Sequence, residues 1–371
     1  MIILISVSGL LIRASGSGFQ SSDFESFLNP WAREMSEMTV QEALSTQVGD
    51  YNVLYQELIL LMTRLPLIGG HVILRYKVLS CLFDYVLAYA SAAIVCEITG
   101  RKASFAPAYA LALILPSVFM NSSVWAQADA IYTLFGMLGV LFLLRKKYVQ
   151  AFLFLGVSFA FKLQAVFFVP VFLYVCVREQ ISFVNFLWVP AVMYAVAVPA
   201  FLAGRPLSAP LAIYLNQTSE YPSLSCNAPN FWGPFNLMEG GYSTFYKSAL
   251  FLCTAVLLTG FYVLISSRKN GRQFVIDTGT FFAWTCFMFL PCMHERYQYP
   301  AEVMLVISAA ASGRRSTAAA AFLAELCIVI IYVQYFAGVT IPQTELTVLS
   351  AVNLSAYAVF AVSLFADREG S

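Results

Sequence analysis

Residues 16–55 read GSGFQSSDFESFLNPWAREMSEMTVQEALSTQVGDYNVLY, a polar stretch in a chain that is otherwise largely apolar. The stretch holds six of the chain's 20 Asp and Glu residues, and a long series of apolar segments follows it. It is too polar to cross a bilayer, and it is too rich in Trp, Phe, Leu and Tyr to be a flexible linker. We therefore expect a loop with short amphipathic helices that lie at a membrane surface.

The composition of the whole chain indicates a membrane protein. Of its 371 residues, 60% are hydrophobic and only 11% are charged, whereas a soluble domain carries about 25% charged residues. The apolar segments do not alternate between polar and apolar positions, as the strands of an outer-membrane barrel do. The predicted fold class is an all-α polytopic membrane protein that forms one integral-membrane domain over residues 1–371.

Runs of apolar residues place the expected membrane segments. They cover 1–13, 72–98, 104–120, 126–144, 149–162, 164–177, 184–203, 246–266, 274–290, 299–312, 316–336 and 346–366. Lys162 and Gln164 interrupt 149–177, which is either one span or a hairpin of two short helices. The first segment is short, because a full span needs about 20 residues. We expect about 10–12 transmembrane helices in all.

The distribution of Lys and Arg predicts the orientation of these segments. Basic residues fall in every second loop, which should therefore be cytoplasmic, as should both termini. They are Arg101, Lys102, Arg145, Lys146, Lys147, Arg178, Arg268, Lys269, Arg272, Arg314, Arg315 and Arg368. The predicted outer loops are 14–70, 121–125, 204–245, 291–298 and 337–345. The first of them is large, 204–245 is a second long one, and together these loops hold most of the polar motifs.

Several common site motifs are absent from the sequence. There is no Walker A motif, no GxGxxG motif after a predicted strand and no CxxC pair. The eight cysteines are scattered along the chain. Cys226 and Cys292 both fall on the predicted outer side, where the sequence allows a disulfide between them.

Two acidic motifs stand out in the first outer loop. Asp23 and Glu25 lie in the motif SSDFE, and Asp50 precedes Tyr51 in the motif GDYN. Asp23 is either the N-cap of a helix, or a general base or part of a site that binds a charged substrate. Asp50 is either an N-cap or a substrate contact.

A third motif, NSSVWAQAD over residues 121–129, enters an apolar segment. It contains Trp125, Gln127 and Asp129, and Tyr132 follows one helical turn later. A buried carboxylate without a partner is costly, so we favour a functional role for Asp129.

A cation and an amide, Lys162 and Gln164, interrupt the apolar run that follows. Lys162 either pairs with an acidic side chain, such as Asp84 or Asp129, or binds phosphate.

Two further motifs lie in later outer loops. His294, Glu295 and Arg296 are consecutive, and Arg suits bidentate recognition of phosphate, although a surface salt bridge is the alternative. The pattern is not a zinc signature, because HExxH is absent and the other histidine is His71. Asn227 lies in NAPNFWG, whose amide and aromatic groups suit sugar binding, although an ordinary ordered loop has the same composition.

The ordered set of motifs resembles a known family. The stretches SSDFESFLNPW, GDYNVLY, WAQADAIYTLF, FKLQAVFFVP, NAPNFWG and MHERYQYP, from about residue 20 to about residue 300, are similar to bacterial GT-C glycosyltransferases. Within these, they resemble the group related to the second mannosyltransferase of GPI-anchor synthesis. The eukaryotic dolichyl-phosphate-glucose glucosyltransferases are a more distant likeness.

The resemblance implies a GT-C-like fold and an inverting glycosyltransferase. Such an enzyme moves a hexose, with mannose as the family's label, from a polyprenyl-phosphate-sugar donor to an acceptor hydroxyl on the extracytoplasmic face. The implied location is the plasma (inner) membrane, or the endoplasmic reticulum membrane facing the lumen in a eukaryote. The implied partners are this donor, membrane lipids and a lipid-linked glycan, polymer or protein acceptor, with no nucleic acid.

The resemblance also implies roles for individual residues. Asp23 would be the general base, and His294, Arg296 and Lys162 would bind the donor phosphate. The implied substrate contacts are Glu25, Asp50, Tyr51, Trp125, Gln127, Asp129, Gln164, Asn227 and Glu295. The chain departs from the family in its short first segment and in Phe24, where the family often has Tyr. No metal is required, since the donor has one phosphate, but Mg²⁺ or Mn²⁺ stays open.

A transporter or flippase of lipid-linked saccharides is the alternative from another class. Such a protein places charges near the middle of the membrane in discontinuous helices. Here the charged motifs gather on one predicted face beside a large outer loop, which favours the enzyme.

Overall fold

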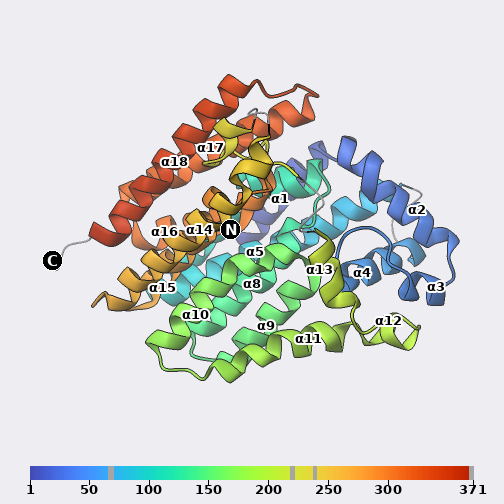
Figure 1. The fold of residues 1–371 in the computed structure, drawn as a ribbon, viewed down its shortest axis with the longest axis horizontal. Coiled ribbons are helices and arrows are strands. Elements are labelled where there is room, and N and C mark those ends of the chain that lie inside the picture. The colour runs from blue at the N-terminus through green and yellow to red at the C-terminus, as the bar shows by residue number, and fades with distance from the viewer. Residues whose placement is uncertain (66–70, 218–221, 237–239, 367–371) are drawn as a thin grey trace. The chain divides into compact units, whose positions relative to one another are not determined.

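The computed structural model is helical almost throughout (Figure 1). It describes residues 1–65, 71–217, 222–236 and 240–366. The chain divides into two compact units whose segments alternate along the sequence. The first unit comprises Met1–Leu87, Val118–Val166 and Phe183–Tyr221, and the second comprises Ala88–Ser117, Phe167–Ser182 and Pro222–Ser371.

The first unit is built from short and medium helices. Its α-helices are α1 (Ile2–Ser15), α2 (Asn29–Glu37), α3 (Val40–Ser45), α4 (Val53–Arg64), the first half of α5 (Val72–Thr99), α8 (Asp129–Leu144), α9 (Tyr148–Phe161), α11 (Trp188–Val196), α12 (Val198–Leu202) and α13 (Ala209–Gln217). Two π-helical turns, η1 (Phe24–Leu28) and η3 (Met120–Val124), and one 3₁₀ helix, η5 (Phe183–Leu187), complete it. Helix α9 is central, because it packs against α4, α8 and α11 (Figure 1).

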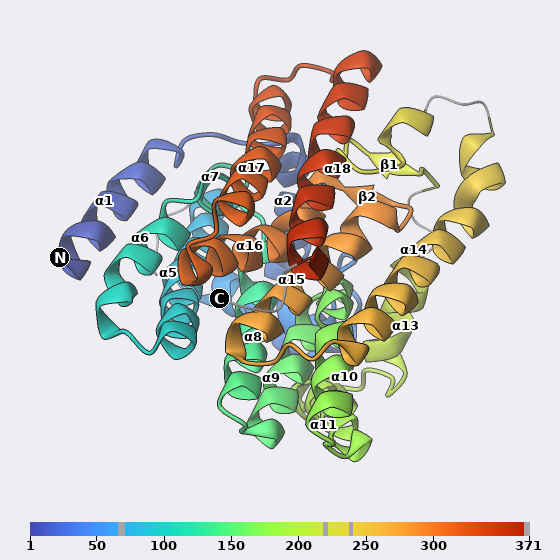
Figure 2. The ribbon, with the colours of Figure 1, turned by 90° about the vertical axis from the view of Figure 1, so that its left-hand side faces the viewer.

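The second unit holds most of the long helices. It contains the second half of α5, α6 (Phe105–Leu113), α10 (Val169–Arg178), α14 (Gly241–Ser266), α15 (Arg272–Phe289), α16 (Tyr299–Ser312), α17 (Arg315–Phe336) and α18 (Gln343–Ala366). The 3₁₀ helices η2 (Lys102–Ser104), η6 (Gly233–Phe235) and η7 (Glu295–Gln298) also belong to it. Strands β1 (Ser225–Cys226) and β2 (Met293–His294) pair in parallel, and α17 lies beside α18 (Figure 2). The short helices α7 (Pro116–Phe119) and η4 (Leu163–Phe168) run across the boundaries between the units.

The expected apolar segments all coincide with helical structure, which confirms the all-α prediction. The run 149–177 is broken in two, because Lys162 has an extended backbone (φ −152°, ψ 142°) that ends α9. The 3₁₀ helix η4 and α10 then continue the run.

Among the described residues, fewer helices than expected are long enough to cross a membrane. In the described part of the chain, four helices are long and apolar enough, namely α5, α14, α17 and α18. A fifth is added if Lys102–Leu113 and Pro116–Val124 form one bent span. Five more apolar stretches are shorter: Ile2–Ser15, Asp129–Leu144, Tyr148–Phe161, Leu163–Arg178 and Phe183–Val196. The protein is therefore an all-helical membrane protein, and the expected count of 10–12 spans stays a prediction.

The polar stretch after α1 forms the expected short helices α2, α3 and α4. Helix α2 is amphipathic, because Ala32 and Met35 are buried while most of its other residues are exposed. Helix α3 begins with a capping box, in which Thr39 and Glu42 bond to each other's backbone N–H groups. Parts of the two long predicted loops (66–70, 218–221 and 237–239) lie outside the described residues, as does Arg368.

Two buried cations fasten the end of α1 and the turn after it to α5. The Arg13 guanidinium lies 2.8 Å from Asp84 Oδ2, and this oxygen also accepts a hydrogen bond from the Ser122 hydroxyl. Lys77 donates to the backbone carbonyls of residues 16, 17 and 19. Since Arg13, Asp84 and Lys77 are each at most 3% exposed, these bonds replace hydration that the buried charges have lost.

We predict that Asp84→Ala strongly destabilises the protein, because it leaves the Arg13 charge buried without its partner. Breaking such a pair typically costs about 3–5 kcal/mol. The double variant Arg13→Met/Asp84→Leu should recover much of this loss, since it removes both charges. Thermal unfolding of the purified variants in detergent measures both effects. An unchanged midpoint for Asp84→Ala would contradict the buried pair.

Candidate functional site

The backbone between η3 and α8 makes an unusual turn. Ala126 has a φ of +66°, a left-handed conformation that non-glycine residues seldom adopt. The N–H of Ala126 bonds to the carbonyl of Ser122, and the N–H of Gln127 bonds to the carbonyl of Asn121. Trp125 and Gln127, on either side of Ala126, both direct a side-chain N–H group at the same carboxylate.

That carboxylate is Asp23. Its Oδ2 accepts hydrogen bonds from Trp125 Nε1 and from Gln127 Nε2, each at 3.1 Å. Asp23 occupies the N-cap position of η1 but makes no side-chain capping bond, and the Ser21 hydroxyl accepts the Phe24 N–H instead. The N-cap interpretation of Asp23 is therefore wrong. Asp23 is partly exposed, so its carboxylate is held in place and still reachable.

The network continues from Gln127 to the second motif of the polar stretch. Tyr51 donates its hydroxyl hydrogen bond to Gln127 Oε1 at 3.3 Å. The Tyr51 ring lies edge-on to Trp31, with 5.8 Å between ring centres, and 4.6 Å from the ring of Tyr55. The side-chain amide of Gln127 therefore links the two residues, because its nitrogen donates to Asp23 and its oxygen accepts from Tyr51.

A buried ion pair lies beside this network. Lys162 Nζ is 2.5 Å from Asp129 Oδ1, and Asn121 Nδ2 donates to Asp129 Oδ2 at 3.0 Å. Lys162 Nζ also lies 5.4 Å from the centre of the Tyr51 ring and 5.6 Å from that of Tyr132. Of the two acidic partners predicted for Lys162, Asp84 and Asp129, the structure pairs it with Asp129. Charge pairing and the two aromatic faces compensate for the loss of water around the ammonium group.

Three other predicted site residues of this unit do not take part in the hydrogen bonds described above. Asp50 does not cap α4, because the Asn52 side chain takes the N-cap role by accepting the Val53 N–H at 2.7 Å. Glu25 is exposed on η1. Gln164 lies on η4, and its buried Oε1 has no hydrogen-bond partner among the described residues.

A second cluster belongs to the other unit. His294 Nδ1 lies 4.0 Å from Glu295 Oε2, and the Arg296 guanidinium lies 5.7 Å from the centre of the Tyr297 ring. Pairing of β1 with β2 places Asn227 against His294 through an isolated antiparallel bridge. Glu295 is only 4% exposed, so the contact between His294 and Glu295 is not a plain surface salt bridge.

Cys226 lies on β1 and Cys292 directly precedes β2, but their thiols are free. The disulfide that the sequence left open is therefore not formed. Burial raises the pKa of the Cys226 thiol to about 11, with the nearby Glu295 carboxylate adding to the shift. Burial also raises the pKa of Cys292.

Sequence reasoning missed several residues that support the first cluster. Lys77 fastens the turn that leads to Asp23, and Arg205 donates to the side-chain oxygens of Gln56 and Gln47 beneath the Tyr51 segment. The sequence nevertheless contains a feature that singles out each of these two cations. Lys77 is a cation inside an apolar run, and Arg205 is the one Lys or Arg of the predicted loop 204–245.

Comparison with the known protein families and with characterised proteins found no match to this chain. In the described residues, no group of three or more His, Cys, Asp and Glu side chains is arranged to hold a metal ion.

We predict that Gly49→Ala disturbs the Tyr51 segment. Gly49 has a φ of +73°, and a Cβ atom there would lie 2.6 Å from Trp31, whose ring packs against Tyr51. The variant should lower the unfolding midpoint in detergent. Gly100→Ala is a control for backbone strain alone, because Gly100 has a φ of +67° with no atom within 4 Å. Equal effects of the two substitutions would show that the Trp31 contact is unimportant.

We also predict a pH-dependent effect at Glu57. Burial raises its pKa from 4.5 to about 7, against the lowering effects of a backbone hydrogen bond from Ala200 and of the Arg205 charge. Folding therefore favours protonated Glu57, and this contribution is complete below about pH 4.5 and lost as the pH rises through about 7. The unfolding midpoint of Glu57→Gln minus that of the wild type should grow between these values. A difference that is constant from pH 4 to pH 8 would contradict the raised pKa.

Proposed function

We propose that the protein is a GT-C-type inverting glycosyltransferase that takes a hexose, with mannose first among the candidates, from a polyprenyl-phosphate-sugar donor. One observation carries the proposal. The partly exposed Asp23 carboxylate is held by two hydrogen bonds beside a buried Asp129–Lys162 ion pair, and these residues come from the motifs that resemble the family.

In the proposed reaction, Asp23 is the general base. An acceptor hydroxyl oxygen attacks the anomeric carbon and transfers its proton to Asp23, while the bond from that carbon to the phosphate oxygen breaks. The phosphate leaves with the electron pair, and the anomeric centre inverts. The Trp125 and Gln127 hydrogen bonds fix the direction of the carboxylate, which a positioned base requires.

The leaving lipid phosphate needs no general acid, but the negative charge that develops on it must be stabilised. We assign this role to His294, Arg296 and Lys162. The charge of Lys162 is already paired with Asp129, so Lys162 is the weakest of the three candidates. Glu25, Asp50, Tyr51, Gln164, Asn227 and Glu295 remain proposed substrate contacts.

The proposed reaction takes place on the extracytoplasmic face of the membrane. The alternation of basic residues along the sequence supports this orientation, because the predicted outer loops contain Asp23, Trp125 and Arg296. The family that the motifs resemble uses polyprenyl-phosphate sugars as donors on this face, and we therefore propose that donor class here.

We predict that Asp23→Asn lowers the turnover of sugar transfer by about 10²–10⁴-fold, as expected when a general base is removed, while donor binding persists. The assay uses purified protein, a short-chain polyprenyl-phosphate mannose and a panel of acceptors. Glu34→Gln is the matched control, because Glu34 is an exposed acid on α2 of the same unit, lies outside the proposed site and should retain most of the activity.

Equal activity of Asp23→Asn and the wild type would contradict the role of Asp23. Movement of an intact lipid-linked saccharide across proteoliposomes, without sugar transfer to any acceptor, would instead support the transporter alternative.

A further inference from the structure

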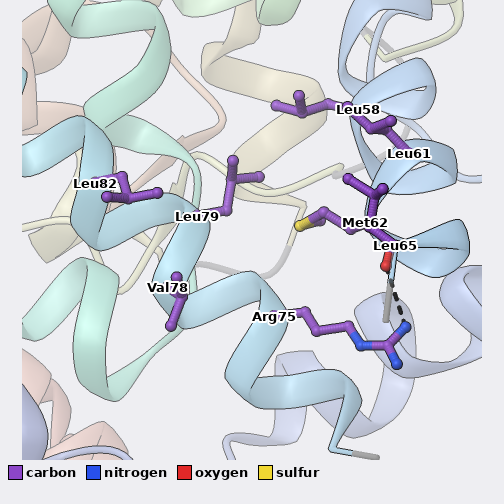
Figure 3. Close-up of a pocket in the computed structure, with 8 residues that line it drawn as sticks. All are labelled: Leu58, Leu61, Met62, Leu65, Arg75, Val78, Leu79 and Leu82. Carbon is purple, nitrogen blue, oxygen red and sulfur yellow. Dashed lines mark hydrogen bonds between the residues drawn. The ribbon is translucent and has the colours of Figure 1, made fainter. Parts of the chain in front are cut away.

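An apolar groove lies between α4 and α5 in the first unit (Figure 3). Its volume is about 180 Å³. Helix α4 contributes Leu58, Leu61 and Met62, Leu65 follows directly after the end of α4, and α5 contributes Arg75, Val78, Leu79 and Leu82. None of these eight residues belongs to the network around Asp23.

The sequence spacing explains how the groove forms. On α5 the lining residues follow the spacing i, i+3, i+4, i+7, and on α4 they follow i, i+3, i+4, which places them along one face of each helix. Seven of the eight are apolar, and the face stays open along its length, because Leu61, Val78 and Leu82 are 51%, 42% and 60% exposed. An open apolar strip of this kind beside a helix that can span a membrane suits a hydrocarbon chain.

Arg75 is the one charged residue of the lining. Its guanidinium donates to the carbonyls of Met62 and Thr63 at 3.1 and 3.4 Å, which holds it against the end of α4. Its Nε is buried and has no hydrogen-bond partner among the described residues, and no described carboxylate forms an ion pair with it. Since guanidinium has five N–H donors, Arg75 retains donors for an anionic oxygen.

The depth of Arg75 fits a lipid headgroup. Helix α5 has 28 residues, which corresponds to about 42 Å at 1.5 Å per residue, whereas the hydrocarbon core of a bilayer is about 30 Å thick. The first turn of α5, which contains Arg75, therefore reaches the headgroup region. Val78, Leu79 and Leu82 follow one and two turns deeper, where acyl chains lie.

We propose that this groove is a binding site for an anionic glycerophospholipid. The phosphate bonds to Arg75, and one acyl chain lies along the leucines of α4 and α5. The occupant is distinct from the sugar donor, because the lining shares no residue with the Asp23 network. This inference does not depend on the proposed function.

The test is native mass spectrometry of the purified protein, titrated with phosphatidylglycerol or phosphatidylcholine of identical chains. The wild type should bind phosphatidylglycerol more tightly. Arg75→Gln should weaken that binding about tenfold and abolish the preference, since a charged hydrogen bond is lost. Arg75→Lys should keep most of it. Leu79→Trp, which fills the groove, should weaken the binding of both lipids.

Arg33→Gln is the matched control, because Arg33 is exposed on α2 in the same unit and does not line the groove. Phosphatidylglycerol binding that is the same in Arg75→Gln and the wild type would overturn the proposal. So would a wild type without preference between the two lipids. Displacement of phosphatidylglycerol by an equal concentration of a polyprenyl phosphate would assign the groove to the lipid carrier and overturn it as well. All of these outcomes are independent of sugar transfer.

Discussion

The burial of charge in an apolar chain is the constraint on which the structure depends. An ionised side chain removed from water is costly unless a partner of opposite charge and further hydrogen bonds replace its hydration. The fold meets this condition repeatedly. Arg13 pairs with Asp84, Lys162 with Asp129, and Arg314 with Asp277, which also accepts a hydrogen bond from the Ser308 hydroxyl. The paired residues are 71, 33 and 37 positions apart, so each pair fixes a contact between different helical segments.

The same constraint separates structural charges from the candidate catalytic group. The Asp129 carboxylate is fully buried, and Lys162 and Asn121 bond to its oxygens, which leaves little room for a reacting molecule. Asp23 differs, because it is partly exposed, and Trp125 and Gln127 orient it through their neutral N–H groups. A carboxylate that is oriented and still reachable from solvent can accept a proton. Exposure therefore favours Asp23 over the fully buried Asp129 as the proposed base.

Local sequence patterns did not predict the contacts of the candidate site, because each pattern is compatible with more than one structural role. Asp23 and Asp50 both stand before helices, where an Asp is a common N-cap. In the structure, Asn52 caps α4, and Asp23 bonds to side chains more than a hundred residues later. The sequence allowed Lys162 to bind phosphate or to pair with either of two acidic residues. Only the packing of α9 against α8 shows which acid it pairs with. For Asp23 and Lys162 no local rule could choose, since the deciding partner is distant in sequence.

Hydropathy alone determined the helical class and the position of every apolar segment, because a chain this apolar must satisfy its backbone hydrogen bonds within helices. Composition likewise determined the short amphipathic helices of residues 16–55. Tertiary structure decided where the helices break, as at Lys162, and how few are long enough to span a membrane. It also decided that Trp125 and Gln127 converge on Asp23, through a left-handed Ala126 that no sequence motif signals. The physical reason is that burial follows from the sum of local hydrophobicity, whereas a convergent site requires specific contacts between distant parts of the chain.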